Sequence, residues 1–132
     1  MTSVINEVLE AVIGMMNDQH PFQGVTRGAL PVHEGIVCEI GPSIQDTMFF
    51  DKNTVIPLDV TLNAKHPNLK TLTDTMNGLH SALTRAKSYP STDRWQIIDI
   101  LNQNIPQIIG REENNDWLAA SALTVRFFWK GD

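Results

Sequence analysis

The sequence predicts an α+β domain with two amphipathic helices packed on one face of a mixed, mainly antiparallel β-sheet. Two stretches carry apolar residues at helical spacing, and several others alternate or form short apolar runs between turn residues. They follow one another as a helix, two or three strands, a helix, and two or three strands, which favours helices layered on one sheet. The 132 residues, of which 42% are hydrophobic, are enough for one domain, 1–132, with a single core.

The first helix is predicted over residues 4–16. Its apolar residues recur at steps of one and three, which gives a stripe two residues wide. The helical stretch ends at His20-Pro21, because the residue before a proline resists the helical conformation. The stripe consists of Val4, Ile5, Val8, Leu9, Val12, Ile13 and Met16.

Two strands are predicted next. The first is the short apolar run GIVCEI, which ends at Gly41-Pro42. The second covers residues 54–62, where every second residue is apolar, as in a strand with one buried face. Pro57 lies within it and lacks a backbone donor, so we expect an edge or a bulge at this position.

Pro67 suits the first turn of the second helix. The helix is predicted to pack through a narrow apolar seam and to end before the segment YPSTD. The seam steps by three and four residues and consists of Leu69, Leu72, Met76, Leu79, Leu83 and Ala86.

A strand RWQIIDIL is predicted to follow, and Pro106 and Gly110 are expected to break the apolar run after it. The last strand, within residues 117–130, is apolar in places on both faces, including Leu118 and Phe128 beside Arg126. A sheet covered on one face usually leaves the other polar. We therefore expect a second layer over this strand, from the chain itself or from another subunit, and favour another subunit.

Composition excludes several classes of function. There are 15 acidic and 10 basic residues, and the basic ones are scattered, which speaks against sequence-specific nucleic-acid binding. One cysteine allows neither an internal disulfide nor a cysteine-based metal site. No apolar run is long enough to span a membrane, and the first residues lack the features of a signal peptide, so a cytoplasmic product is expected.

The stretch HEGIVCEIG contains the only cysteine, Cys38, five residues after His33. In a strand these two side chains point to opposite faces, about 17 Å apart at roughly 3.3 Å per residue. A nucleophile and its base need a separation of about 3 Å. We therefore interpret Cys38 as a buried core residue with an unreactive thiol.

No other catalytic or metal site is predicted. The histidines lack metal-binding spacing: His20 and His66 precede prolines, and His80 lies off the apolar seam. The acidic pairs, Asp46 with Asp51 and Glu112 with Glu113, fall in polar turns. The sequence also lacks a phosphate loop, a nucleophile elbow and a dinucleotide fingerprint. We expect no enzymatic activity and no cofactor.

The order of these features resembles small tailed-bacteriophage proteins known as minor capsid or tail-completion proteins, which have the tail-terminator fold. The resembling features run nearly from end to end of the chain. They are the first amphipathic helix, MFFD, VIPLDVTLNAKH, NLKTLTDTMNGLHSAL closed by YPS, WQIIDILNQNIPQIIGRE and WLAASALTVRFFW.

The resemblance implies a structural virion protein that forms a ring, usually a hexamer, at the head-tail interface. Its neighbours would be the tail tube protein and the head-completion or connector proteins, and it would be made in the host cytoplasm. A ring of one chain needs two different patches that meet around a closed rotation. We expect Leu118, Arg126, Phe128 and Lys130 in one patch. Met48 and Phe49 lie in an arm that forms a second patch or packs on its own core.

An enzyme and an interaction domain of unrelated role are the rival hypotheses. A thiol or acid–base hydrolase would need residues that this sequence does not assemble. A non-enzymatic oligomeric domain would use the same fold, since an α+β architecture does not determine function.

Overall fold

The computed structural model describes residues 2–31, 33–41 and 54–130. It contains helices α1 (Thr2–Asn17) and α2 (Leu69–Thr84). The five strands are β1 (Val25–Thr26), β2 (Gly35–Ile40), β3 (Thr54–His66), β4 (Trp95–Arg111) and β5 (Trp117–Trp129). The predicted α+β class is confirmed.

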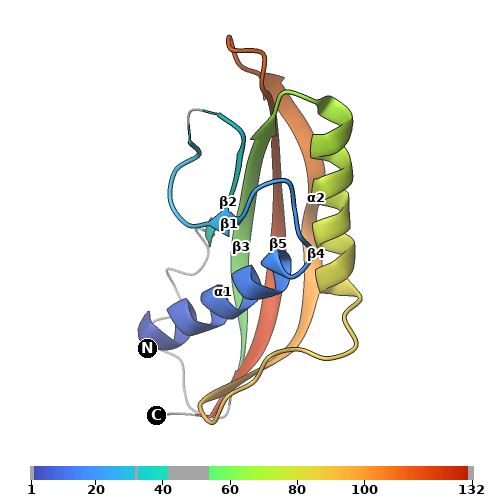
Figure 1. The fold of residues 1–132 in the computed structure, drawn as a ribbon. Helices are drawn as coiled ribbons and strands as arrows, with labels where there is room; N and C mark the ends of the chain where they lie inside the picture. Colours follow the sequence, from blue (N-terminus) through green and yellow to red (C-terminus); the bar gives the residue numbers. More distant parts are fainter. Residues whose placement is uncertain (1, 32, 42–53, 131–132) are drawn as a thin grey trace.

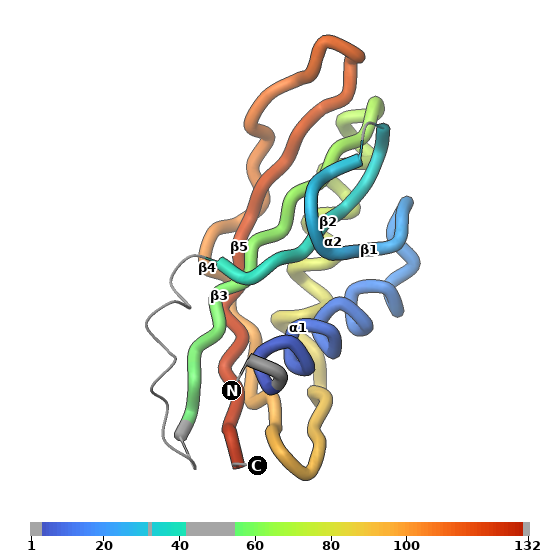
Figure 2. The backbone as a smooth tube through the Cα atoms, turned by 90° about the vertical axis from the view of Figure 1, so that its left-hand side faces the viewer, coloured from blue at the N-terminus to red at the C-terminus, as the bar shows by residue number. Residues whose placement is uncertain are grey.

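The strands form one sheet in the order β1-β2-β3-β5-β4. Only β1 and β2 pair in parallel; the other three pairs are antiparallel. Both helices lie on the same face, with α2 running along β4 and α1 crossing the lower half of the sheet (Figure 1). Figure 2 shows the same two layers from the side.

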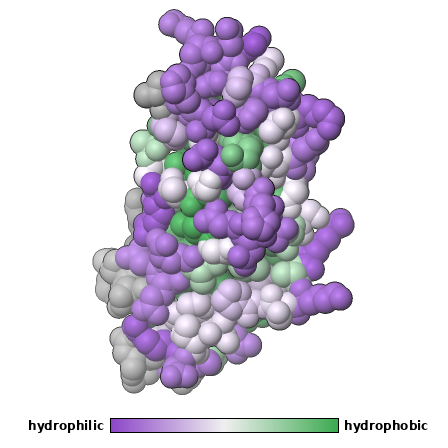
Figure 3. All heavy atoms as spheres, in the orientation of Figure 1, coloured by the Kyte–Doolittle hydropathy of each residue, from purple (hydrophilic) through white to green (hydrophobic). Residues whose placement is uncertain are grey.

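The core lies between the sheet and the two helices. The odd-numbered residues of β5 from Ala119 to Trp129 face it together with the apolar stripe of α1. Phe127 is the largest side chain that is fully buried there. The outer surface on this side is largely hydrophilic, with a smaller hydrophobic area near its middle (Figure 3).

Helix α1 matches its prediction, but α2 begins two residues later than expected. Asn68 is its N-cap, and the Asn68 side chain accepts a hydrogen bond from the Thr71 backbone N–H at 2.9 Å. Pro67 therefore precedes the cap and is not in the first turn. Leu69, assigned to the seam, is exposed at the start of the helix, and Ala86 lies beyond its end.

Among the described residues, Pro57 lies at an edge, as expected. Strand β2 pairs only with residues 60–65 of β3, and Pro57 pairs with Arg126 of β5 on the other side. The Asp59 carbonyl, two residues on, accepts a hydrogen bond from Gly41, so the backbone at odd positions faces the β2 side. The missing donor of Pro57 therefore costs no ladder hydrogen bond within the described residues.

The predicted break after residue 101 is wrong, because β4 continues through Pro106 and Gly110 to Arg111. The pairing with β5 shifts register four times, between Ile97 and Gly110. These irregularities accommodate the proline, which sits on β4, the last strand of the sheet among the described residues.

Adjacent phenylalanines test the assignment of the two faces. Phe127→Ala should lower the free energy of unfolding by about 3–5 kcal/mol, because it leaves a cavity in the core. Phe128→Ala, on the other face, should cost less than half as much. Urea denaturation of both variants measures the difference, and equal losses would contradict the assignment.

Candidate functional site

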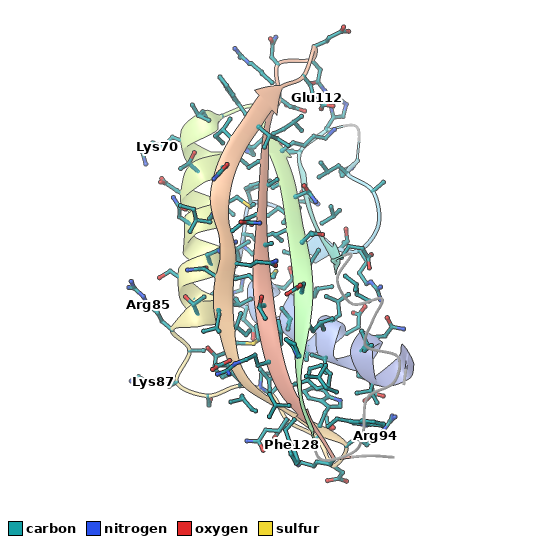
Figure 4. All side chains as sticks on the ribbon, turned by 180° about the vertical axis from the view of Figure 1, so that it is seen from behind. Lys70, Arg85, Lys87, Arg94, Glu112 and Phe128 are labelled. Carbon is teal, nitrogen blue, oxygen red and sulfur yellow. The ribbon has the colours of Figure 1, made fainter. Side chains whose placement is uncertain are left out.

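The face of the sheet opposite the helices is not covered by another described helix or strand (Figure 4). In antiparallel pairs the partners point to the same face. The even-numbered residues of β5 therefore share this face with the β3 and β4 residues paired to them. Phe128 pairs with Val55 and Gln96, and Thr124 pairs with Asp59 and Leu101.

Apolar side chains line the β4 side of this face. Leu101, Ile105 and Ile109 have exposed fractions of 47%, 63% and 61%. Ile105 and Ile109 flank a shallow hollow of about 390 Å³, whose floor includes Ala120 and Ala122. Exposed aliphatic residues gathered over small residues are typical of surfaces that bind other proteins. We call this surface, with Phe128, Leu118 and Arg126, the uncovered sheet face.

Charged groups on the uncovered sheet face are satisfied within the chain. The Arg126 Nε donates to Asp99 Oδ1 at 2.7 Å, and a second bond joins Arg126 Nη2 to Asp99 Oδ2. These bonds lower the pKa of Asp99 and raise that of Arg126. Thr124 Oγ1 donates to Asp59 Oδ1 at 2.9 Å. A partner would meet paired charges, which require less desolvation than free ones.

The predicted contact residues separate into three groups. Leu118, Arg126 and Phe128 all lie on the uncovered sheet face, as the alternation of β5 requires, with Leu118 near one end of the strand and the other two near its opposite end. Lys130 lies just past β5, and its Nζ donates to the Thr92 carbonyl at 3.0 Å, so it is bound to its own chain. Met48 and Phe49 lie outside the described residues.

Cys38 is fully buried in the core, as predicted. Burial raises the pKa of its thiol to about 12, with a smaller contribution from the Glu39 carboxylate. His33 is exposed and precedes β2. The thiolate is the reactive species, so Cys38 has little of it at neutral pH.

A disulfide reagent tests this burial. Cys38 in the folded protein should react at least about 100-fold more slowly than in the unfolded chain, because reaction requires the structure to open. Thiol absorbance assays with and without urea measure the two rates. Comparable rates would show that the thiol is exposed.

His80 is the residue that sequence reasoning misplaced. It is buried, although it lies off the apolar seam. Its Nδ1 lies 2.8 Å from Asn102 Oδ1, and its Nε2 lies 2.6 Å from Ser121 Oγ. Because the Asn102 oxygen only accepts, Nδ1 carries the proton and Nε2 accepts from the Ser121 hydroxyl.

The order serine, imidazole and amide resembles the arrangement of a nucleophilic hydrolase. A nucleophile must, however, reach a substrate carbonyl, and Ser121 is only 7% exposed. The three residues come from β5, α2 and β4. We interpret them as a polar bridge that holds α2 to the sheet.

The polar bridge makes stability depend on pH. Burial lowers the pKa of His80 below its ordinary value of 6.5, against a smaller opposite effect of Asn102. A depressed pKa gives stability that is present above 6.5 and is lost as the pH falls toward the folded-state pKa. The unfolded chain then binds the proton more readily than the folded one.

His80→Leu tests the polar bridge. Above pH 7 it should lower the free energy of unfolding by about 1–3 kcal/mol, because Asn102 and Ser121 lose a buried partner. The difference from the wild type should shrink as the pH falls below 6.5. Urea titrations between pH 5 and 8 measure it, and a constant difference would contradict the assignment.

The described residues contain no group of three or more His, Cys, Asp or Glu side chains able to hold a metal ion. Within the same residues, neither helix has the length and apolar character that crossing a membrane requires. No protein-family model matches the chain, and no curated protein matches it.

Proposed function

We propose that the protein is a structural subunit of a phage or prophage virion, of the tail-terminator or minor capsid type. In this role, copies of the chain form a closed ring at the head-proximal end of the tail tube. The observation that supports the proposal best is the uncovered sheet face, where aliphatic side chains stay exposed, Arg126 is paired with Asp99, and Asp59 accepts a hydrogen bond from Thr124.

This surface suits contact between subunits in two respects. Its apolar area would be removed from water, at about 25 cal/mol per Å². Its ion pair between Arg126 and Asp99 would enter the contact intact, so no single charge would be left without a partner. A ring would join this face to a different patch of the neighbouring copy, which makes the contact heterologous.

The proposed role includes neighbours above and below the ring. The tail tube protein would contact one side and the head-completion or connector proteins the other. Packaged DNA would pass through the centre. The net charge of −5 would keep the ring from binding phosphates as DNA moves past.

The alternative is a non-enzymatic oligomeric domain with an unrelated role. It would use the uncovered sheet face in the same way but would not act on tails. Disruption of the gene in its phage separates the two hypotheses: the proposal predicts overlong tails or tails that do not attach to heads. Normal particles would contradict it.

Assembly of the purified protein tests the contact itself. Light scattering should show an oligomer, and electron microscopy should show rings. Arg126→Glu with Phe128→Ser should shift the mass to that of the 14.8 kDa chain, with an unchanged circular dichroism spectrum. The change removes an aromatic contact and places a second carboxylate beside Asp99.

Lys70→Glu, with the same change of charge on the exposed side of α2, is the matched control and should leave assembly intact. If the double variant melts instead of dissociating, the face belongs to the core. If the wild type stays monomeric at every concentration and salt tested, with tail tubes present or absent, the ring proposal fails.

A further inference from the structure

The outer edge of β4 is the longest stretch of strand that pairs with nothing on one side in the described chain. β4 is the last strand of the sheet. Its first residues are nevertheless covered on that side. The Pro90 carbonyl accepts from the Ile97 backbone at 3.1 Å, and Ser91 forms a bridge with Gln96.

The segment that covers the outer edge of β4 reaches only as far as Ile100. The Tyr89 hydroxyl lies beside the Ile100 backbone and donates to the Leu83 carbonyl at 2.6 Å. Past that point, none of the described residues forms a backbone hydrogen bond with residues 101–110 from the outer side. The edge is thus closed by the chain's own segment over its first part and is open over the rest.

The open part of the edge is uncharged. Residues 100–110 read ILNQNIPQIIG, whereas exposed edges are commonly protected by charged residues. Pro106 and the shifts of register make the edge uneven, which hinders pairing with a second regular sheet. The lack of charge leaves the edge open to pairing, and its unevenness disfavours a second regular sheet. A single extended peptide is therefore the partner that we expect at this edge.

Helix α2 forms the second wall of a groove at this edge. Seen from behind, α2 projects past the outer edge of β4 (Figure 4). A hollow of about 260 Å³ lies between them. Its lining includes Asn77, Ser81 and Thr84 of α2, Arg85 at the C-cap of that helix, and Asn102 and Ile105 of β4. We call this the β4 groove.

Helix α2 also limits which kind of partner can fit at the edge of β4. An added strand lies about 4.8 Å from the edge strand, so a single extended chain fits beneath α2. A second copy joined edge to edge through its own β4 in antiparallel fashion would bring its own projecting α2 into the same space. The geometry therefore disfavours antiparallel pairing with a second copy.

Charge indicates the chemistry of the peptide. The β4 groove has no carboxylate in its lining. Arg85 is exposed and has no ion pair within the described residues. Its side chain extends outward from the end of α2, near that of Lys87 (Figure 4). A carboxylate on the peptide would complement this end of the groove.

We propose that the β4 groove binds an extended segment of a partner protein, which adds as a strand to residues 101–110 and places a carboxylate at Arg85. Backbone hydrogen bonds supply the affinity in this mode of recognition, and alternate side chains supply the specificity. The proposal does not depend on the ring proposed above, since it uses the backbone edge of β4, although Ile105 lines both the β4 groove and the hollow on the uncovered sheet face.

A pool of labelled ten-residue peptides tests the proposal. Valine, isoleucine or threonine occupies alternate positions, serine the others, and one glutamate is placed in turn at each position. Fluorescence anisotropy should reveal binders, and hydrogen exchange should show added protection at residues 101–110. N-methylation of alternate peptide amides should weaken the best binder at least tenfold when it removes the donors that face β4.

A charge exchange tests the role of Arg85. Arg85→Glu should weaken the glutamate peptide at least fivefold, and the same variant should regain binding to a peptide with lysine in place of the glutamate. Lys70→Glu, at the other end of α2, is the matched control and should leave binding unchanged.

Any of the following results would overturn the proposal. The first is that no peptide of the pool binds. The second is that both N-methylated forms, with either set of alternate amides blocked, bind as well as the parent. The third is that protection appears outside residues 101–110, or that the chain dimerises through this edge without peptide, which would make a second copy the occupant.

Discussion

The unbroken pairing of β3 with β5 is the interaction on which the rest of the structure depends. It runs from Thr54 opposite Trp129 to His66 opposite Trp117 without a shift of register. Because side chains alternate along both strands, this single register assigns every residue of the centre of the sheet to one of two faces. A slip of one residue would place Phe127 in solvent and Phe128 under the helices.

The two faces of the sheet differ in what covers them. One is covered by α1 and α2 and forms the core, whereas the other holds a paired arginine and aspartate among exposed aliphatic residues. Lys65 and Glu112 close this second face at the β4–β5 turn through an ion pair of 3.0 Å, in which the Lys65 side chain is nearly buried. The open area therefore lies along β4 and the middle of β5, which is the area that the proposed assembly uses.

Local patterns predicted most of this fold. The alternation from Ile56 to Leu62 and the stripe of α1 depend on periods of 2.0 and 3.6 residues, which a sequence displays directly. The course of β4 could not be read in this way, because tolerance of Pro106 depends on which side of the strand lacks a neighbour. The hydrogen-bond partners of His80 lie 22 and 41 residues away in sequence. The residues next to His80 in the sequence therefore could not predict its burial. The common face of Leu118, Arg126 and Phe128 followed from the alternation of β5, but the β4 groove depends on where α2 lies relative to an edge.

The central claim is that the uncovered sheet face is a contact between copies of the chain. Hydroxyl-radical footprinting of the assembled and the dissociated protein, read by mass spectrometry, tests it most directly. The account predicts that Leu101, Ile109 and Phe128 lose reactivity on assembly, while Leu69, on the exposed side of α2, does not change. Equal labelling of Leu101, Ile109 and Phe128 in both states would contradict it.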